Sequence, residues 1–274
     1  MPTKSEWDPD QYRRHADDRA RPFHDLLARV PDTPPPARVT DLGCGAAHTT
    51  TALLLRRWPD AHITGVDNSP EMLRAAEPHA GPSPTGRGRL SLRLADITEW
   101  RPEPGEEPDL LISNAALHWV PGHAHLFPRW IDALPPGGVF AFQVPGNFSA
   151  PSHTLLNELR ESPRWRDEVG GTAGGLAPDG PAVLDPAGYL EVLASLGCTV
   201  DAWETTYLHV LRGEDPVLDW VRGTTLRPVL TRLAPERHAE FLAEYGALLR
   251  QAYPATPHGT VLPFRRIFVV ARKA

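Results

Sequence analysis

The sequence predicts an α/β protein with a Rossmann-like, doubly wound, mostly parallel sheet of seven strands. Apolar runs of strand length alternate with longer helical patterns, which is typical of βαβ units. The first of these strands runs into Asp41-Leu42-Gly43-Cys44-Gly45, where two glycines let the backbone turn sharply and approach a ligand closely. A chain of 274 residues is long enough for one such domain with an elaboration.

The N-terminal half predicts a complete nucleotide-binding half-sheet of five strands. Ser69 followed by Pro70 is a helix start, because serine caps the first turn and proline is tolerated in it. A helical region rich in His and Trp precedes the fifth strand. The expected strands are 37–42, 61–66, 90–94, 108–113 and 138–144, the expected helices are 20–30, 48–58 and 70–78, and 79–89 is expected to be a surface loop.

The C-terminal half predicts two more strands with a helical insertion before the last one. The expected helices are 152–162, 186–196 (closed by Gly197), 214–227 and 235–253, the strands are 198–209 and 262–271, and 170–180 is expected to be a flexible loop. We therefore divide the chain into N-terminal cap helices (1–35), a cofactor-binding half (36–145), and the remainder of the same sheet (146–274) with a substrate cap at about 210–258.

Composition favours a cytoplasmic enzyme for a small metabolite. Apolar residues make up 41% and charged residues 23%, and a net charge of -6 argues against nucleic acid as a partner. No apolar run has transmembrane length, and the first twenty residues are too polar for a secretory signal, so we expect no membrane association. Cys44 and Cys198 have neither a metal-ligand spacing nor a disulfide pattern, so no metal is expected. Oligomeric state stays open, and a monomer is compatible with the sequence.

The glycine turn also indicates which nucleotide is bound. A dinucleotide fingerprint needs a third glycine at the start of the helix, and that position holds His48. Asp41, just before the turn, would repel a phosphate but accept a hydrogen bond from an ammonium group. The sequence therefore predicts a nucleoside that bears an amino acid, and S-adenosyl-L-methionine fits that description.

Polar side chains follow the next strands at the same edge of the predicted sheet, where open α/β sheets bind ligands. Asp67 is placed to accept the ribose hydroxyls, and Asp96 to accept the adenine amino group while Ile97 packs on the ring. A solvated strand-end carboxylate is the simpler interpretation of each, and only the partnership with the glycine turn favours binding. Asn114 lies at the edge too. His118-Trp119 could face the substrate or pack in the core.

The residues carry a resemblance that extends from end to end. The first half resembles the class I S-adenosylmethionine-dependent methyltransferases, and the whole chain is similar to the trans-aconitate 2-methyltransferase family. The supporting stretches are Trp7-Asp8-Pro9 with Tyr12, DLGCG, TALLLRRWPDAHITGVDNSPEML, NAALHWVPGH, QVPGN, TTYLH, DWV, TLRP and FRRIFVVAR. The chain departs from the family where Ala46-Ala47-His48 replaces Pro-Gly-Asn, where His118 replaces Gln, and where Phe148 replaces Trp.

This resemblance implies transfer of a methyl group to a carboxylate oxygen, which gives a monomethyl ester. A carboxylic acid is already ionised at neutral pH, so no general base is required, and His118 and Trp119 act by positioning. The implied cofactor-binding residues are Tyr12, Arg21, Asp41, Gly43, Gly45, Asp67, Asn68, Met72, Asp96, Ile97 and Asn114. The implied substrate-binding residues are Trp119, Gln143, Asn147, Tyr207, His209, Trp220, Arg227 and Arg266.

Arginine is the expected partner for the other carboxylates of a polyanion, because its planar fork binds carboxylates bidentately. Arg265 and Arg266 are adjacent on a strand, so only one can point inward, and the family match favours Arg266. Tyr207 and His209 share a strand face by the same parity. We also expect Trp220 and Arg227, seven residues apart, to lie on one helical face. Ordinary core packing is the alternative for all of these side chains.

Three other functions stay open at this point. The same fold and cofactor could serve another small carboxylic acid or a biosynthetic metabolite. The chain could be a cofactor-binding module without catalysis. A nicotinamide oxidoreductase would use a similar sheet, but the missing third glycine and Asp41 disfavour it.

Overall fold

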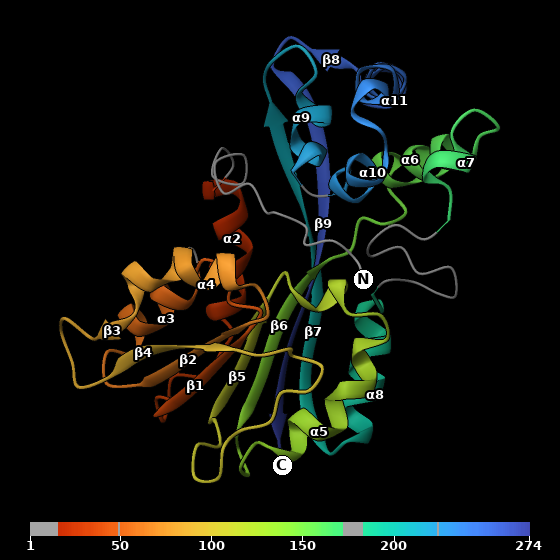
Figure 1. Cartoon of the computed structure of the whole chain (residues 1–274). Coiled ribbons are helices and arrows are strands. Elements are labelled where there is room, and N and C mark those ends of the chain that lie inside the picture. Colours follow the sequence, from red (N-terminus) through yellow and green to blue (C-terminus); the bar gives the residue numbers. More distant parts are fainter. Residues whose placement is uncertain (1–15, 49, 172–182, 224) are drawn as a thin grey trace. The chain divides into compact units, whose positions relative to one another are not determined.

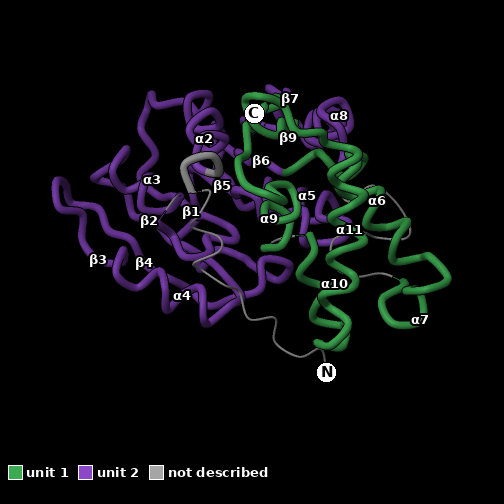
Figure 2. Tube along the Cα trace, turned by 90° about the horizontal axis from the view of Figure 1, so that it is seen from above, with its two compact units in different colours: residues 1–14, 145–182, 205–266 green, residues 15–144, 183–204, 267–274 purple. Residues whose placement is uncertain are grey.

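The computed structural model describes residues 16–48, 50–171, 183–223 and 225–274. The chain folds into two compact units, each built from separate stretches of sequence (Figure 2). Unit 2 contains His15–Val144, Val183–Glu204 and Ile267–Ala274, and unit 1 contains Pro145–Ala182 and Thr205–Arg266. The two longest strands therefore belong partly to each unit.

Strands of the described residues form one nine-stranded sheet in the order β3-β4-β2-β1-β5-β6-β9-β7, with β8 paired to β9. β2 pairs with β1 and β4, and β5 with β1 and β6, all in parallel, as the alternating pattern predicts. The seven expected strands are present as β1 (Arg38–Leu42), β2 (His62–Asp67), β4 (Arg89–Leu94), β5 (Leu110–Asn114), β6 (Val139–Pro145), β7 (Cys198–Leu211) and β9 (Gly259–Lys273). The other two strands, β3 (Gly81–Pro82) and β8 (Ala255–Thr256), are two residues long and antiparallel to their partners.

The stretch 79–89, expected to be a loop throughout, contains β3. Gly81 pairs with Leu90 and Pro82 with Arg89, so the chain folds back on β4 before entering it. A two-residue strand has no hydrophobic period that a sequence pattern could show, which explains why it was not predicted.

Helices cover both faces of the sheet in unit 2. Figure 1 shows α2, α3 and α4 on one side, and α5 and α8 on the other. Their bounds are α2 (Ala16–Leu27), α3 (Thr51–Arg57), α4 (Pro70–Ala76), α5 (Phe127–Asp132) and α8 (Pro186–Ser195), with short 3₁₀ turns η1 (Glu77–His79), η2 (Leu117–Trp119) and η3 (His123–Leu126). The Ser69 side chain accepts a hydrogen bond from Met72 N, so the predicted cap of α4 is confirmed.

Aromatic side chains fill the core between β6 and the helices beside it. The Phe127 ring lies 5.2 Å from Phe140 and 5.5 Å from Phe142, and Tyr189 of α8 closes the cluster edge-on against Phe142 at 5.0 Å. Every residue of β6 is buried, because helices cover it on both faces. This rigid centre holds the neighbouring strand ends in place.

Unit 1 packs several helices, with parts of β7 and β9, around its own apolar core. The helices are α6 (Pro151–Glu161), α7 (Arg166–Val169), α9 (Pro216–Arg222), α10 (Arg227–Arg232), η4 (Pro235–Arg237) and α11 (His238–Ala252). Leu156, Trp165, Leu226, Phe241 and Tyr245 are fully buried in this core. The helical insertion before the last strand is therefore present, whereas the expected loop at 170–180 lies, from 172 on, outside the described residues.

The expected single helix over 214–227 is wrong. α9 ends at Arg222 with Gly223 as its C-cap, and α10 begins at Arg227 with Pro228 in its first turn. Gly223 ends the first helix inside the expected range, and Pro228, which has no N–H, fits the first turn of the second. Trp220 and Arg227 consequently lie on different helices, and the argument that placed them on one helical face fails.

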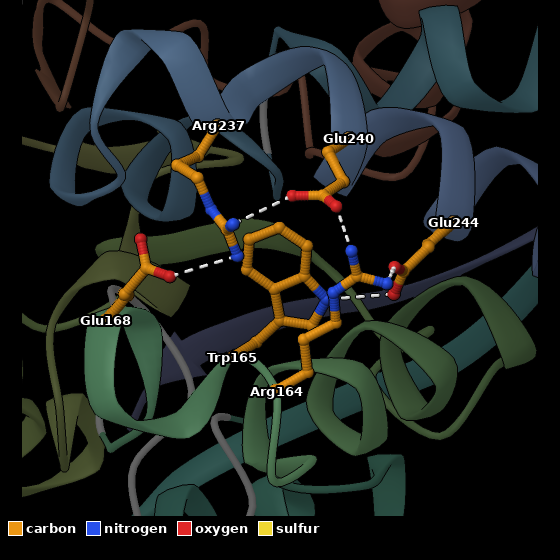
Figure 3. A network of polar contacts seen from close by, with 6 residues as sticks. All are labelled: Arg164, Trp165, Glu168, Arg237, Glu240 and Glu244. Atoms are coloured by element: carbon orange, nitrogen blue, oxygen red, sulfur yellow. Dashed lines mark hydrogen bonds and ion pairs between the residues drawn. The ribbon is translucent and has the colours of Figure 1, made fainter.

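Charged residues join α7 to α11 around a buried tryptophan (Figure 3). The Trp165 ring has the guanidinium carbon of Arg164 at 5.4 Å and that of Arg237 at 4.5 Å from its centre. Trp165 Nε1 donates to Glu244 at 2.9 Å, and Arg164 is also paired with Glu244. Each arginine is further bound to Glu240. The cluster holds the short helix α7 against α11. Helix propensity alone would not stabilise a helix of four residues.

Candidate active site

The glycine turn is tied to the strand beside it. Gly43 N and Cys44 N both donate to the Val66 carbonyl of β2, at 2.8 and 3.0 Å. Gly43 has φ +78°, and a Cβ on it would lie only 2.3 Å from the Ala116 Cβ. Glycine is thus required there twice over, by backbone conformation and by the close approach of the segment after β5. The turn that the sequence singled out is preorganised.

Asp67 organises the same turn from the end of β2. Its carboxylate accepts hydrogen bonds from Gly45 N and Ser69 N, both at 2.9 Å. Burial raises the pKa of Asp67, while these two backbone donors act in the opposite direction. A carboxylate has about four lone-pair sites, so two backbone bonds leave room for ligand hydroxyls. Asp67 therefore both supports the turn and keeps the acceptors expected for a ribose.

Asp41 is a buried carboxylate with an incomplete set of partners. It is 1% exposed, and Oδ2 accepts a hydrogen bond from the Thr51 hydroxyl at 2.7 Å. Burial raises the pKa of Asp41 from 3.8 to about 7, and the nearby Asp67 charge adds to the effect. Among the described residues Oδ1 has no hydrogen-bond partner. A buried acceptor without a donor fits the ammonium group of an amino-acid-bearing nucleoside.

The other strand ends lie at the same edge, because β1, β2, β4 and β5 are parallel neighbours. Asp96 is exposed, and its carboxylate accepts from the backbone N and the hydroxyl of Thr98, both at 2.8 Å. Ile97 beside it is buried. Asn114 Oδ1 accepts from Gln143 Nε2 at 2.6 Å. The edge therefore carries the acceptors that the sequence predicts, although their roles stay predictions.

His118 and Trp119 follow β5 in η2. Ala115, just before, has φ +52°, a left-handed conformation that turns the chain away from the strand. His118 is buried, and its ring centre lies 4.8 Å from that of Trp119, which is 38% exposed. A tryptophan left partly open beside a buried histidine is compatible with the predicted contact to a substrate.

Unit 1 brings four of the predicted substrate residues together. The His209 ring lies 6.4 Å from Tyr207 and 4.6 Å from Trp220, so the predicted shared face of β7 is confirmed. Phe264 of β9 lies 5.8 Å from Trp220, and the guanidinium carbon of Arg266 lies 4.6 Å from the Phe264 ring. Arg266 is 8% exposed, whereas Arg265 is more accessible and donates to the Gly146 carbonyl. The two neighbouring arginines therefore differ in burial, as strand parity requires, and the buried one is Arg266, which the family match favours.

The remaining predicted residues are placed separately. Arg227 is half-buried at the first turn of α10, and Asn147, after β6, is buried with no described partner for Oδ1. Arg21 is exposed on α2 and pairs weakly with Asp25 at 3.9 Å. Asn68 is exposed, Met72 is half-buried in α4, and Tyr12 lies outside the described residues.

The chain is similar in sequence to known proteins over nearly its whole length. The chain is 59% identical to the trans-aconitate 2-methyltransferase of Streptomyces avermitilis over 97% of both chains. It is 47% identical to that of Rhodococcus jostii, over 97% of this chain and 99% of the relative. This chain belongs to the trans-aconitate 2-methyltransferase family. Residues 39–138 match the methyltransferase domain family, a segment that ends just before β6 and contains the carboxyl ends of β1, β2, β4 and β5.

Solved structures resemble this methyltransferase chain more distantly. They include the YcgJ protein of Bacillus subtilis, with a TM-score of 0.49 and 15% identity over 86% of this chain and 92% of that one. The plantazolicin methyltransferase BpumL, solved in complex with SAH, has a TM-score of 0.48 and 10% identity over 97% and 86% of the two chains.

Three contacts, one in unit 2 and two in unit 1, were not expected from the sequence. Thr51 donates to Asp41, Phe264 carries the Arg266 guanidinium, and His153 of α6 binds Thr225 in the link before Arg227 at 3.3 Å. Parity on β9 could have found Phe264, two residues before Arg266. The other two contacts join segments that no local pattern connects.

In the described part of the chain, no helix is long and apolar enough to cross a membrane. No group of three or more His, Cys, Asp or Glu is arranged there to hold a metal ion.

Proposed function

We propose that this chain is an S-adenosyl-L-methionine-dependent O-methyltransferase that esterifies one carboxylate of trans-aconitate to a monomethyl ester. The observation that carries the proposal is the 59% identity over 97% of both chains to a relative named for that reaction. The glycine turn with Asp67 and the Tyr207–Arg266 cluster support it, because they supply acceptors for a nucleoside and a buried cation in one chain.

The residues at the strand ends of β1, β2 and β4 would hold the cofactor. The unpartnered Asp41 Oδ1 fits its ammonium, Asp67 its ribose hydroxyls, and Asp96 with Ile97 its adenine. When bound, the cofactor supplies an electrophilic methyl group on a cationic sulfur. The protein's own contribution is to hold that group still, and orientation alone can supply a large part of a rate enhancement.

The nucleophile needs no activation by the protein. A carboxylate is ionised at neutral pH, and its negative charge is lost as the ester forms, so a site poor in water favours the reaction. Within unit 1, the His209 and Trp220 rings lie 4.6 Å apart and cover surface that water would otherwise reach. The chain's task is to exclude water and orient the acid.

Arg266 and Arg227 would pair with the carboxylates that are not methylated. A carboxylate left unpaired in a desolvated site costs several kcal/mol, so a trianion needs at least two cations around it. Arg266 is held over the Phe264 ring at 4.6 Å, which orients its planar fork before any ligand arrives. Preorganisation of this kind lowers the entropy cost of binding.

A labelled-methyl assay across tricarboxylic and dicarboxylic acids tests the proposal, with the ester located by mass spectrometry. We expect trans-aconitate to have the highest kcat/KM. Preference for another small acid would overturn the substrate while leaving the reaction class intact. Binding of S-adenosylhomocysteine without methylation of any acid would indicate a cofactor-binding module instead.

A further inference from the structure

Helix α6 carries a polar face inside the helical core of unit 1. His153, Asn157 and Arg160 are spaced four and three residues apart, which places them on one side of the helix. His153 and Arg160 are 5% exposed, and the Asn157 side-chain oxygen is buried. Buried polar side chains need hydrogen-bond partners, so a row of them requires an explanation.

Arg160 is the least satisfied member of this face. Its Nη2 donates to the Gly171 carbonyl at 2.8 Å and lies 3.6 Å from Glu161 Oε1. Within the described residues, Nε and Nη1 have no hydrogen-bond partner. Glu161 is itself occupied by Gly171 N at 2.9 Å and is half-exposed to water. A buried guanidinium with most of its N–H groups unused is costly unless an acceptor arrives.

Asn157, one turn earlier, is a second and independent sign of a missing ligand. Its Oδ1 is also buried without a described partner. An amide can rotate by half a turn to present its NH₂ instead, so Asn157 can donate to an anion that Arg160 attracts. Two adjacent unsatisfied groups on one face are more readily explained by one polar ligand than by two separate defects.

His153 connects this face to Thr225, in the link between α9 and α10. Its Nδ1 lies 3.2 Å from the Ser152 hydroxyl and its Nε2 3.3 Å from the Thr225 hydroxyl, two residues before Arg227. Burial lowers the pKa of His153 to about 4, so it is neutral at physiological pH and does not compete for an anion. The polar face therefore begins beside one predicted carboxylate-binding arginine and ends at another cation.

We propose that Asn157 and Arg160 of α6 form a carboxylate subsite. This subsite receives a substrate carboxylate that is not methylated. The inference rests on the proposed function, since it assumes a small polycarboxylate as substrate. It assigns discrimination between tricarboxylates and dicarboxylates to α6, a helix for which the sequence predicted no site residue. A carboxylate that accepts from Nε or Nη1 of Arg160 would pair a donor that is buried without a partner among the described residues.

The central experiment compares Arg160→Met with the parent on trans-aconitate and on trans-glutaconate, which has the same five-carbon chain but lacks the third carboxylate. We expect the KM for trans-aconitate to rise about 10–100-fold, with kcat within about threefold and the KM for trans-glutaconate unchanged. Arg166→Met is the matched control, because Arg166 is 62% exposed and pairs only loosely with Asp167 at 3.8 Å. An unchanged KM for trans-aconitate in Arg160→Met overturns the subsite.

Thermal unfolding without ligands separates a binding role from a structural one. A cation kept unsatisfied for a ligand destabilises the free protein, so Arg160→Met should unfold at the same temperature or higher. A lower unfolding temperature together with a KM raised equally for both acids would make Arg160 structural and contradict the proposal. Asn157→Leu provides a second test should Arg160→Met fail to fold, and it should raise only the KM for trans-aconitate.

The subsite can be tested even if trans-aconitate is not the substrate. Trans-aconitate and citrate at millimolar concentration, added with S-adenosylhomocysteine, should raise the unfolding temperature of the parent and of Arg166→Met but not of Arg160→Met. That result without methyl transfer would retain the subsite and reject the proposed substrate. Equal stabilisation of parent and Arg160→Met would reject the subsite whatever the substrate is.

Discussion

Asp41→Asn should make the cofactor-free protein more stable above neutral pH. The Asp41 pKa is raised from 3.8 to about 7, chiefly because the carboxylate is buried. Between these values the unfolded chain has lost the proton while the folded protein still holds it, so the unfolding free energy falls as pH rises. About three pKa units at 1.36 kcal/mol each give a penalty of about 4 kcal/mol that is complete above pH 7.

Asparagine has nearly the same shape, cannot ionise, and can still accept the hydrogen bond from Thr51. Urea unfolding followed by tryptophan fluorescence from pH 5 to 8 measures the difference. The advantage of Asp41→Asn should grow by about 1.4 kcal/mol per pH unit up to pH 7 and then level off. Asp96→Asn, an exposed carboxylate at the same sheet edge, should change stability by less than about 0.5 kcal/mol throughout.

The cofactor should reverse this penalty. An ammonium group beside Asp41 Oδ1 favours the ionised carboxylate, so S-adenosylhomocysteine should bind the parent more tightly as pH rises from 6 to 8. Asp41→Asn should remove most of this dependence. Parallel affinity profiles for parent and variant, or a stability difference that does not vary with pH, would refute the reasoning.

Further predictions concern the turn and the arginine. Asp67→Ala should lose about 1.5–3 kcal/mol of S-adenosylhomocysteine affinity by calorimetry, typical of hydrogen bonds to a charged group, and unchanged affinity would remove its assignment. Gly43→Ala should destabilise the fold by about 2–4 kcal/mol, because the new Cβ meets Ala116 and the φ is left-handed. Adding Ala116→Gly should recover only the part of this loss that is due to the contact with Ala116. Ala47 has φ +61°, so Ala47→Gly should raise the unfolding free energy by about 0.5–1 kcal/mol in denaturant titrations. A lower unfolding free energy would show that packing of the Ala47 methyl group outweighs its backbone strain. Arg266→Met should raise the KM for trans-aconitate about 10–100-fold with little change in cofactor affinity, and parent-like kinetics would make Arg266 structural.

The sheet could be predicted almost completely from local pattern. Each long strand is an apolar run between turn residues, and Ser69-Pro70 defined a helix start that the structure confirms. Prediction failed where a short element depends on tertiary contacts. Strand β3 exists only because Gly81 pairs with Leu90, and α7 is four residues held by the Trp165 cluster. The break between α9 and α10 begins at Gly223, a residue that disfavours the interior of a helix.

In the candidate site too, residues in a local sequence pattern could be predicted, whereas residues that depend on tertiary contacts could not. Asp41, the glycine turn and Asp67 could be named because a sharp turn after a buried strand has few physical uses. Strand parity indicated that only one of Arg265 and Arg266 points inward, and the family resemblance, not a local pattern, favoured Arg266. The polar face of α6 was missed, since its residues are unremarkable in sequence and become notable only when they are buried without partners.

The interleaved course of the chain through two units constrains the order in which the protein can form on the ribosome. In the sheet, β9 lies between β6 and β7, although it is the last of the three to be synthesised. Until Gly259–Lys273 has emerged, β6 has an unpaired edge, and exposed strand edges invite association with other chains. Chains that end before residue 259 should therefore depend on chaperones. Chains that include all of β9 should lose this dependence in one cooperative step.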